Sequence, residues 1–380
     1  LQRAAQRTLE RPILPGSDPK RDEVWFENPV GAICLVSTRG DILAAASVPT
    51  REELPPPGRD GERGNVVERT LRRHTFEPPG SVLKPFVALY ALENLGWDPS
   101  ETTDCARISS RGAGWESLHC HSTAGHGPLA LHEALMCSCN AYFARIGENY
   151  SVDQLEEMLS VFGFGRPTGV RSLGKRSGLR EDFQSPGTIK LIEAQPGEPR
   201  NRLMRQAANG LSLIEATPLQ VARATTGLLT GELPELRLID RIDGEPLPRR
   251  VEPLPFSPEN LMRVQDAMFD VVNEVGGSAH NKGMNKNDLG FQVAAKTGSA
   301  DYRSFEPGFG PTLSGGRKSS KVRKHTWIAG WFPAEDPVAV LVVYLHDVTE
   351  TSSHTSVHVA AQFLRSPEVQ TFVSEWKRRP

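Results

Sequence analysis

Ser81 and Lys84 are the first residues in this chain whose types and spacing could do chemistry. They lie in residues 79–85 (Pro-Gly-Ser-Val-Leu-Lys-Pro), directly before an apolar helical pattern. Positions i and i+3 of a helix share one face, so the lysine amine would lie within hydrogen-bonding reach of the serine hydroxyl. A lysine held neutral by burial and neighbouring charge can take the serine proton and so create a nucleophile. Exposed helices contain this spacing by chance, so the assignment depends on partners elsewhere in the chain.

Two further polar motifs supply such partners. Residues 138–140 (Ser-Cys-Asn) are predicted to lie in a loop between two helices, and residues 296–299 (Lys-Thr-Gly-Ser) at the end of an edge strand over residues 291–299. Alone, the first of these is more often a helix cap, and the second is as often an ordinary strand end. The three motifs in this order, at a helix start, an inter-helix loop and an edge-strand end, resemble the motif set of a known group of active-serine proteins, and that resemblance indicates a serine acyl-transfer site.

The elements that must position these motifs indicate an α/β fold. The patterns predict one hairpin over residues 31–48, a second over residues 326–345, and a buried central helix that starts at Ser81. The Arg-Gly-Asp sequence at residues 39–41 is interpreted as a hairpin turn rather than a cell-adhesion motif. We expect a central antiparallel sheet of about five strands, built from the two hairpins and the Lys296 strand, with helices on both faces and an all-helical lobe.

The helices of this fold are predicted from periodicity and end signals. Pro128 is expected in the first turn of a helix that runs to about Met136, and Thr217 is expected to cap a helix that begins at Pro218. The other predicted helices cover the start of the chain and residues 140–146, 152–162, 259–274 and 354–376.

Length and composition limit the classes of protein to which the chain can belong. The chain has 380 residues, of which 38% are hydrophobic and 24% charged, so it can bury one large core or two ordinary ones and is not disordered. The formal net charge of -2 argues against a nucleic-acid binder, for which a basic footprint is expected. The basic, glycine-rich stretch over residues 301–324 is interpreted as a solvated loop rather than a binding surface.

The first residues of the chain read as the middle of a longer protein. They are Leu-Gln-Arg at residues 1–3, with no initiating Met and no signal peptide. No run of about 18 apolar residues occurs, so no transmembrane helix is predicted. We therefore expect an excised fragment, with residues 1–25 a lead-in from a missing N-terminal region and residues 26–380 one domain.

The sequence resembles the transpeptidase domain of penicillin-binding proteins, and more closely the monofunctional class B group of the kind that elongates rod-shaped cells. Besides the three motifs, the likeness extends to residues 125–127 (Gly-His-Gly), 162–165 (Phe-Gly-Phe-Gly), 216–222 (Ala-Thr-Pro-Leu-Gln-Val-Ala) and the hairpin at 327–345. It covers about residues 1–365. The resemblance implies the penicillin-binding transpeptidase fold, which is like that of serine β-lactamases.

Two departures from the family's pattern are visible. The Gly-Gln-Gly often found before the Thr-Pro-Leu-Gln helix is Ala-Asn-Gly at residues 208–210. The third motif ends in Ser299 rather than Thr, which preserves a hydroxyl. The likeness is weakest across residues 171–205 and 232–258.

The resemblance implies a role for each residue of the first two motifs. Ser81 would attack the carbonyl of a terminal D-Ala-D-Ala bond and form an acyl-enzyme, with Lys84 as the general base. Ser138 would pass a proton to the leaving D-alanine, while Lys296 keeps the local field positive. Asn140 would bind a substrate amide or fix Lys84.

The third motif is expected to hold the substrate. Thr297 and Ser299 would bind the substrate carboxylate beside Lys296, and Gly298 would let the substrate pack against the strand, where a side chain would intrude. Backbone N–H groups of Ser81 and Ser299 would form the oxyanion hole, in which each donor is typically worth about 3–4 kcal/mol.

The function implied by the resemblance is a peptidoglycan D,D-transpeptidase that cross-links stem peptides and is inhibited by β-lactams. It needs no cofactor for catalysis and has no nucleic-acid partner. A membrane glycan polymerase of the elongation machinery is the expected partner. The domain would face the periplasm or the cell exterior, with its anchor in the inner (cytoplasmic) membrane and absent from this fragment.

Other functions and origins stay open on the sequence alone. A serine β-lactamase or D,D-carboxypeptidase would use the same nucleophile, but is usually shorter between the second and third motifs than the 156 residues (296 minus 140) from Asn140 to Lys296. A β-lactam-sensing receptor domain would share the Ser81 motif but not the Thr-Pro-Leu-Gln region. A bifunctional class A origin is a further alternative, because the upstream segment is missing.

A second constellation is formed by Cys105, Cys120, His126 and Cys139. Three thiolates and one imidazole suit tetrahedral structural zinc, although spacings of 15, 6 and 13 residues are not those of a standard zinc finger. The resemblance adds that some elongation-type penicillin-binding proteins carry zinc near this loop, at positions like these. A Cys105–Cys120 disulfide is the main alternative, because thiols oxidise outside the cytoplasm. An unliganded cluster also stays open.

The cysteine count favours a metal or redox site over a disulfide framework. The chain has five cysteines, and four of them fall within 35 residues. Cys137, His119 and His121 are alternative ligands. Cys34 is expected to be a buried strand residue.

Overall fold

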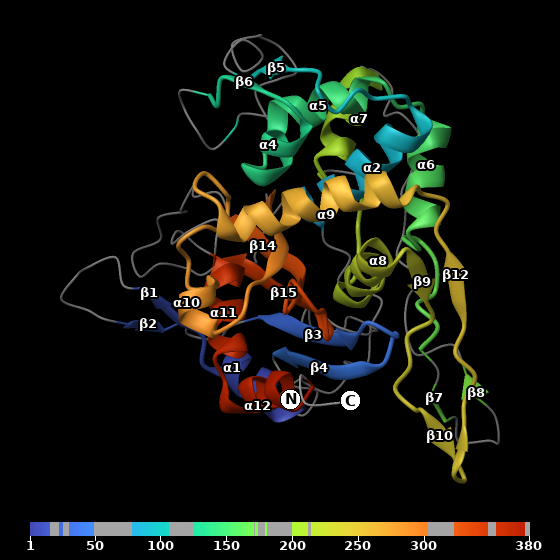
Figure 1. The fold of residues 1–380 in the computed structure, drawn as a ribbon, viewed down its shortest axis with the longest axis vertical. Coiled ribbons are helices and arrows are strands. Elements are labelled where there is room, and N and C mark those ends of the chain that lie inside the picture. Colours follow the sequence, from blue (N-terminus) through green and yellow to red (C-terminus); the bar gives the residue numbers. More distant parts are fainter. Residues whose placement is uncertain are drawn as a thin grey trace, which may run out of the picture.

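A five-stranded antiparallel sheet lies beneath a helical lobe in the computed structural model of the protein (Figure 1). Most of the basic stretch predicted to be a loop at residues 301–324 lies outside the described residues. The structure describes residues 1–15, 23–25, 30–48, 78–105, 120, 125–170, 172–173, 179–180, 200–211, 214–302, 323–348 and 355–376.

The sheet consists of the two predicted hairpins and the strand of the third motif, which confirms the expected α/β fold. Every residue of the strand at residues 31–37 is buried, since helices cover both faces of the sheet. The strand that carries Lys296 lies at one edge. The order is β13 (Ala294–Tyr302), β14 (Arg323–Phe332), β15 (Ala339–Val348), β3 (Gly31–Ser37) and β4 (Ile42–Val48), with every neighbouring pair antiparallel.

The Arg-Gly-Asp sequence forms the turn between β3 and β4. Ser37 Oγ accepts a hydrogen bond from the backbone N–H of Asp41 at 3.0 Å, and Gly40 has a φ of +85°. The Asp41 carboxylate is paired with Arg237. The interpretation as a hairpin turn is therefore confirmed.

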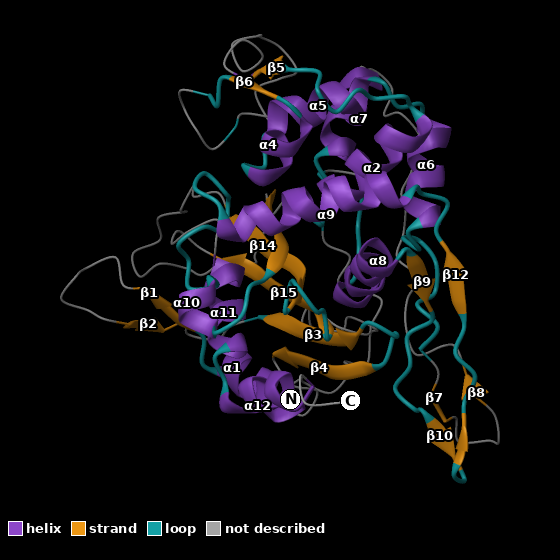
Figure 2. Ribbon diagram, in the orientation of Figure 1, coloured by secondary structure: helices purple, strands orange, loops and turns teal. Residues whose placement is uncertain are grey.

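Helices cover both faces of the sheet (Figure 2). On one face, α1 (Gln2–Glu10), α11 (Thr355–Leu364) and α12 (Pro367–Trp376) enclose a hydrophobic core. On the other face, α8 (Pro218–Thr230) packs against β3 and β15. This helix begins as predicted, with Thr217 as its cap.

The lobe is organised around α2 (Lys84–Asn94), the helix that follows Ser81. Its residues from Lys84 to Ala91 are all buried. A helix that is apolar all round must be covered on every side. The elements in contact with it are α4 (Leu131–Met136), α5 (Asn140–Glu148), α6 (Val152–Val161) and α9 (Pro258–Asn273).

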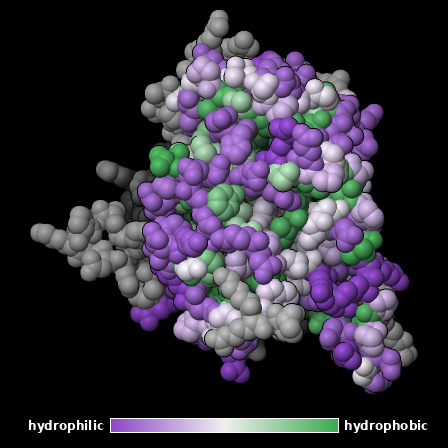
Figure 3. Space-filling view, in the orientation of Figure 1, coloured by the Kyte–Doolittle hydropathy of each residue, from purple (hydrophilic) through white to green (hydrophobic). Residues whose placement is uncertain are grey.

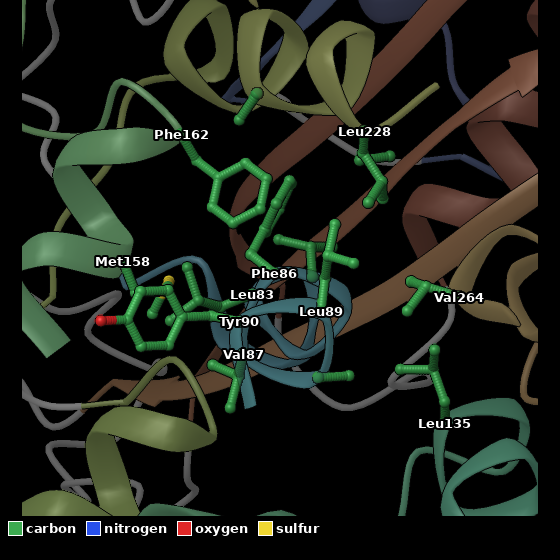
Figure 4. Close-up of a cluster of buried hydrophobic side chains, with 14 of the residues drawn as sticks. Leu83, Phe86, Val87, Leu89, Tyr90, Leu135, Met158, Phe162, Leu228 and Val264 are labelled. Carbon is green, nitrogen blue, oxygen red and sulfur yellow. The ribbon is translucent and has the colours of Figure 1, made fainter. Parts of the chain in front are cut away.

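Aromatic side chains fill the space around α2. Phe86 meets Phe162 and Phe164 edge to face, with ring centroids 4.8 and 5.5 Å apart. Figure 4 shows Met158 and Val264 entering the same cluster from neighbouring helices. This packing fixes the direction of the helix whose first residue is Lys84.

Short paired strands and two more helices complete the fold. The arm formed by β9 to β12 runs beside the lobe and the sheet (Figure 1), and its tip is largely hydrophilic (Figure 3). The pairs are β1 (Ile13–Pro15) with β2 (Glu23–Trp25), β5 (Thr103–Asp104) with β6 (Pro128–Leu129), β7 (Ser172–Leu173) with β8 (Leu179–Arg180), β9 (Glu232–Pro234) with β12 (Val251–Pro253), and β10 (Arg241–Ile242) with β11 (Glu245–Pro246); the helices are α7 (Arg200–Ala208) and α10 (Lys286–Leu289).

Two predicted elements have wrong boundaries. The helix expected from Pro128 begins at Leu131, because Pro128 pairs with Asp104 in β6 and β5. Local helix-start signals cannot reveal that pairing. The strand of the third motif runs from Ala294 to Tyr302, so the motif lies within the strand rather than at its end.

The structure also divides or adds elements. The single helix predicted over residues 354–376 is two helices, with the break before Pro367, whose ring opposes a continuous helix. Neither helix α7 nor the β9–β12 arm was predicted.

Helix α1 is part of the core rather than a separate extension. Ala4, Ala5 and Leu9 are buried, and the helix packs against β4 and α11. The domain boundary expected after residue 25 stays a prediction. Within the part of the chain that the structure describes, no helix is long and apolar enough to cross a membrane.

Candidate active site

Ser81 lies in η1 (Gly80–Leu83), a 3₁₀ turn that leads directly into α2. Residues three apart are eclipsed in a 3₁₀ helix, so Ser81 and Lys84 share a face as predicted. Gly80 has a φ of +57°, and a Cβ there would lie 2.5 Å from the carbonyl oxygen of Ser299. The nucleophile segment can therefore approach the third motif only with glycine at this position.

The Lys84 side chain is completely buried and faces the second motif. Its Nζ donates hydrogen bonds to Asn140 Oδ1 at 2.7 Å and to the carbonyl oxygen of Ser138 at 2.9 Å, and lies 3.4 Å from Ser138 Oγ. Burial lowers the pKa of Lys84 to about 8, although the thiols of Cys139 and Cys120 act in the opposite direction. A substantial neutral fraction is therefore available near neutral pH, which a general base needs.

Ser138 has an unusual backbone conformation between α4 and α5. Its φ is +62°, in the left-handed region that non-glycine residues rarely adopt. This conformation lets the Ser138 carbonyl and hydroxyl both approach the Lys84 amine. Strained residues of this kind cluster at functional sites.

Lys296 is the second completely buried amine of the site. Its Nζ donates to the carbonyl oxygen of Thr297 at 3.0 Å. Burial lowers the pKa of Lys296 well below its ordinary value, and the charge of Lys84 lowers it further. The five residues Ser81, Lys84, Ser138, Asn140 and Lys296 are called the catalytic cluster below.

Gly298 is required by packing of the protein itself. A Cβ at this position would lie 2.8 Å from the carbonyl oxygen of Pro79 and 3.0 Å from the backbone nitrogen of Val82. Trp327, the partner of Gly298 across the sheet, donates from its Nε1 to the carbonyl oxygen of Pro78 at 3.1 Å. Glycine thus allows η1 to rest on the strand, while its expected contact with substrate stays a prediction.

Two polar residues near the motifs make contacts that were not predicted from the sequence. Ser278 Oγ lies 2.6 Å from Thr297 Oγ1. Asn209 donates to the carbonyl oxygen of Asn140 at 3.2 Å, and the neighbouring Gly210 accepts from the backbone N–H of Gly80 at 2.9 Å. The departure from the family pattern at residues 208–210 pointed to Asn209, but nothing local indicated its contact.

The predicted metal ligands also come together. Cys105 Sγ lies 3.3 Å from Cys120 Sγ and 3.5 Å from His126 Nδ1, and Cys120 Sγ lies 3.6 Å from Cys139 Sγ. All four ligand atoms are within 4.8 Å of one another. We call these four residues the thiol cluster.

The spacing of the thiol cluster fits a tetrahedral metal site. Zinc with Zn–S bonds of about 2.3 Å separates sulfur atoms by about 3.8 Å, and sulfur from imidazole nitrogen by about 3.5 Å. A disulfide needs about 2.05 Å between sulfurs, and all five cysteines are free in the structure. A hydrogen bond from the Cys139 thiol lowers the pKa of Cys120, while the same contacts and burial raise the pKa of Cys139. Cys120 is therefore the member of the cluster that most favours the thiolate form, which binds metal.

Of the alternative ligands, Cys137 lies in the described part of the chain and is not one of the four. Cys137 is buried next to the second motif, while His119 and His121 lie outside the described residues. Cys34 is completely buried in β3, as predicted, and burial raises its pKa.

The fold and the catalytic cluster together are those of an α/β domain of the active-serine type, with the candidate nucleophile Ser81 at the start of a buried helix beside an edge strand. The comparison with known families agrees. Residues 31–366 match the family "Penicillin binding protein transpeptidase domain", and the chain belongs to this family.

Within the family, the chain is similar to elongation-type class B proteins. Peptidoglycan D,D-transpeptidase MrdA of Haemophilus influenzae is 26% identical over 296 residues, which cover 73% of this chain and 42% of the relative. The chain thus spans less than half the length of that curated relative.

Solved structures share the fold. Penicillin-binding protein PBP2 of Helicobacter pylori, solved in complex with MreC, superposes with a TM-score of 0.67 at 23% identity, over 92% of this chain and 61% of that one. A chain of a peptidoglycan synthase complex that coordinates polymerization and crosslinking superposes with a TM-score of 0.66 at 20% identity, over 92% of this chain and 56% of that one.

Proposed function

We propose that this domain is a peptidoglycan D,D-transpeptidase that cross-links stem peptides through a Ser81 acyl-enzyme. The observation that carries the proposal is the environment of Lys84. Its buried amine, with a pKa lowered to about 8, lies one turn after Ser81 and contacts both polar residues of the second motif. Membership of the family and the similarity to MrdA support the same reaction.

Acylation would begin when Ser81 Oγ attacks the carbonyl of the penultimate D-alanine and its proton passes to Lys84 Nζ. The backbone N–H groups of Ser81 and Ser299 would stabilise the oxyanion. As the peptide C–N bond breaks, the Ser138 hydroxyl would protonate the leaving D-alanine. Ser138 would recover its proton from Lys84, whose Nζ is 3.4 Å away.

Deacylation would complete the cross-link. An acceptor amine of a second stem peptide attacks the ester carbonyl, a new amide bond forms, and Ser81 is released as a hydroxyl. Thr297, Ser299 and Lys296 would hold the terminal carboxylate of the donor during the first half-reaction. A β-lactam would acylate Ser81 in the same way and block the site.

The partners and location follow from the relatives. One structural relative was solved with MreC, and another belongs to a peptidoglycan synthase complex. We infer a membrane glycan polymerase of the elongation machinery as a partner. The domain would face the periplasm or cell exterior and be anchored in the inner membrane by a segment outside this sequence.

We further propose that Cys105, Cys120, His126 and Cys139 hold one structural zinc ion. The metal would neutralise the thiolates and cross-link segments that lie far apart in sequence. Elemental analysis should find about one zinc per chain, and chelation should lower the melting temperature. Metal-free protein with two fewer free thiols than cysteines would instead establish the disulfide.

Incubation with a fluorescent penicillin, followed by a D-Ala-D-Ala donor with an acceptor amine, tests the function. We expect a stable covalent adduct and transfer of the donor to the acceptor. Rapid hydrolysis of the drug would indicate a β-lactamase, and D-alanine release without transfer would indicate a carboxypeptidase. A stable adduct with no reaction of the donor would indicate a sensor domain.

A further inference from the structure

We propose that Ser278 is a positioning residue that orients the Thr297 hydroxyl toward the carboxylate of the acyl donor. Ser278 lies outside the three motifs, in the connection between α9 and β13. The inference rests on the proposed function, because the carboxylate that Thr297 would bind belongs to the acyl donor.

The backbone around Ser278 is held by the end of α9. Gly277 donates to the carbonyl oxygen of Glu274 at 3.0 Å, and Ala279 donates to that of Val271 at 2.9 Å. A Cβ on Gly277 would lie 2.4 Å from the carbonyl oxygens of Asp270 and Val271. The turn is therefore pressed against the helix, and Ser278 is positioned independently of Thr297.

Ser278 contacts both the end of α4, which precedes the second motif, and the third motif. Its backbone N–H donates to the carbonyl oxygen of Met136 at 3.1 Å, and Met136 is two residues before Ser138. Its Oγ lies 2.6 Å from Thr297 Oγ1, a short distance for two hydroxyl groups. One residue thus contacts both the end of α4 and the strand that carries Lys296.

The direction of this hydrogen bond decides what Thr297 can offer a ligand. A hydroxyl has one proton to donate and accepts from others. When Ser278 donates to Thr297, the Thr297 proton is left for another acceptor, and a carboxylate can only accept. A bound carboxylate therefore selects the order Ser278 to Thr297 to carboxylate, in which each bond strengthens the next.

Burial makes this arrangement specific to Ser278. Ser278 and Thr297 are 9% and 6% exposed, so water has little access to replace either hydroxyl. Without the Ser278 hydroxyl, Thr297 would lose the donor that fixes its proton. Recognition of the carboxylate would weaken, while the chemistry at Ser81 and Lys84 would be unaffected.

The test measures acylation of the protein by benzylpenicillin and by its methyl ester, each in competition with a fluorescent penicillin. In Ser278→Ala, the second-order rate constant for benzylpenicillin should fall about tenfold, the worth of one charge-assisted hydrogen bond. The ester, which lacks the carboxylate charge, should change less than about twofold. The loss should appear in the concentration for half-maximal rate rather than in the limiting acylation rate.

Three variants control this test. Ser278→Thr keeps a hydroxyl and should restore discrimination between acid and ester. Ser356→Ala removes another buried hydroxyl, one with no hydrogen-bond partner among the described residues, and should change neither rate. In a Thr297→Val background, Ser278→Ala should have no further effect, because its acceptor is gone.

Each result decides the proposal. Unchanged discrimination in a folded Ser278→Ala protein, or equal losses for acid and ester, would overturn the role of Ser278 alone. If Ser278→Ala does not fold, Ser278→Cys, which retains only a weak donor, should show the same selective loss. Absence of acylation in the wild-type protein would overturn the proposed function, and with it this inference.

Discussion

The catalytic cluster and the thiol cluster meet at residues 138–140, but they are held in place differently. Ser81 and Lys84 belong to one continuous helical segment, and Lys296 lies in the edge strand β13, each residue of which pairs with β14. In the thiol cluster, Cys105 directly follows the two-residue strand β5, and His126 stands between two glycines with positive φ. Ser81, Lys84 and Lys296 are thus held by regular secondary structure, whereas the thiol geometry depends on contacts among the thiols themselves.

The two clusters are linked through Asn140. Its backbone N–H donates to Cys120 Sγ at 3.2 Å, while its side chain accepts from Lys84 at 2.7 Å. Changes in the thiol cluster should therefore affect stability first and rate second. Changes in the catalytic cluster should affect rate first.

The largest effect is expected for Ser81→Ala. Removing the nucleophile should lower acylation by at least about 10³-fold, with the melting temperature nearly unchanged because Ser81 is not part of the buried core. Intact-protein mass spectrometry after incubation with penicillin measures the adduct. An adduct in this variant would show that another residue is the nucleophile.

Lys84→Met should come next, with acylation about 10²–10⁴-fold slower, the usual worth of a general base. Methionine fills a similar volume, so loss of the base is separated from loss of packing. Stopped-flow labelling with a fluorescent penicillin gives the rate. A rate within about threefold of wild type would exclude Lys84 as the base.

The pH dependence of acylation should follow Lys84. Its pKa is lowered to about 8 by burial, so the amine is increasingly protonated below that pH and cannot accept the Ser81 proton. Each pH unit below about 8 should slow acylation about tenfold, with a plateau above. The residual rate of Lys84→Met serves as the control and should lack this dependence.

In the thiol cluster, Cys139→Ser should release the proposed zinc and lower the melting temperature by about 5 °C or more. Acylation should fall less than about tenfold, because Ser138 and Asn140 keep their bonds to Lys84. Elemental analysis and calorimetry measure the two effects. Full acylation loss with an unchanged melting temperature would contradict the division between the clusters.

The smallest effect is expected for Cys34→Ala, the matched control. Cys34 is completely buried in β3 and belongs to neither cluster. Loss of one sulfur atom should cost about 1 kcal/mol, or roughly 2 °C in melting temperature. Zinc content and acylation rate should stay at wild-type values; a loss of zinc would place Cys34 among the ligands.

The sequence by itself determined the three motifs and the main sheet. Ser81 and Lys84 share a face of one helical segment. Alternating apolar patterns with turn residues between them predict the hairpins. The thiol quartet was identified from residue type and resemblance, and the structure brings its four ligand atoms together.

Only the tertiary structure decided how distant backbone segments meet. Pro128 fits a helix start locally, but its pairing with Asp104 places it in a strand. Gly298 is needed because η1 packs on its strand, and Ser278 reaches Thr297 because α9 ends beside β13. Such contacts depend on the positions of elements far apart in sequence, and local propensity carries no information about those positions.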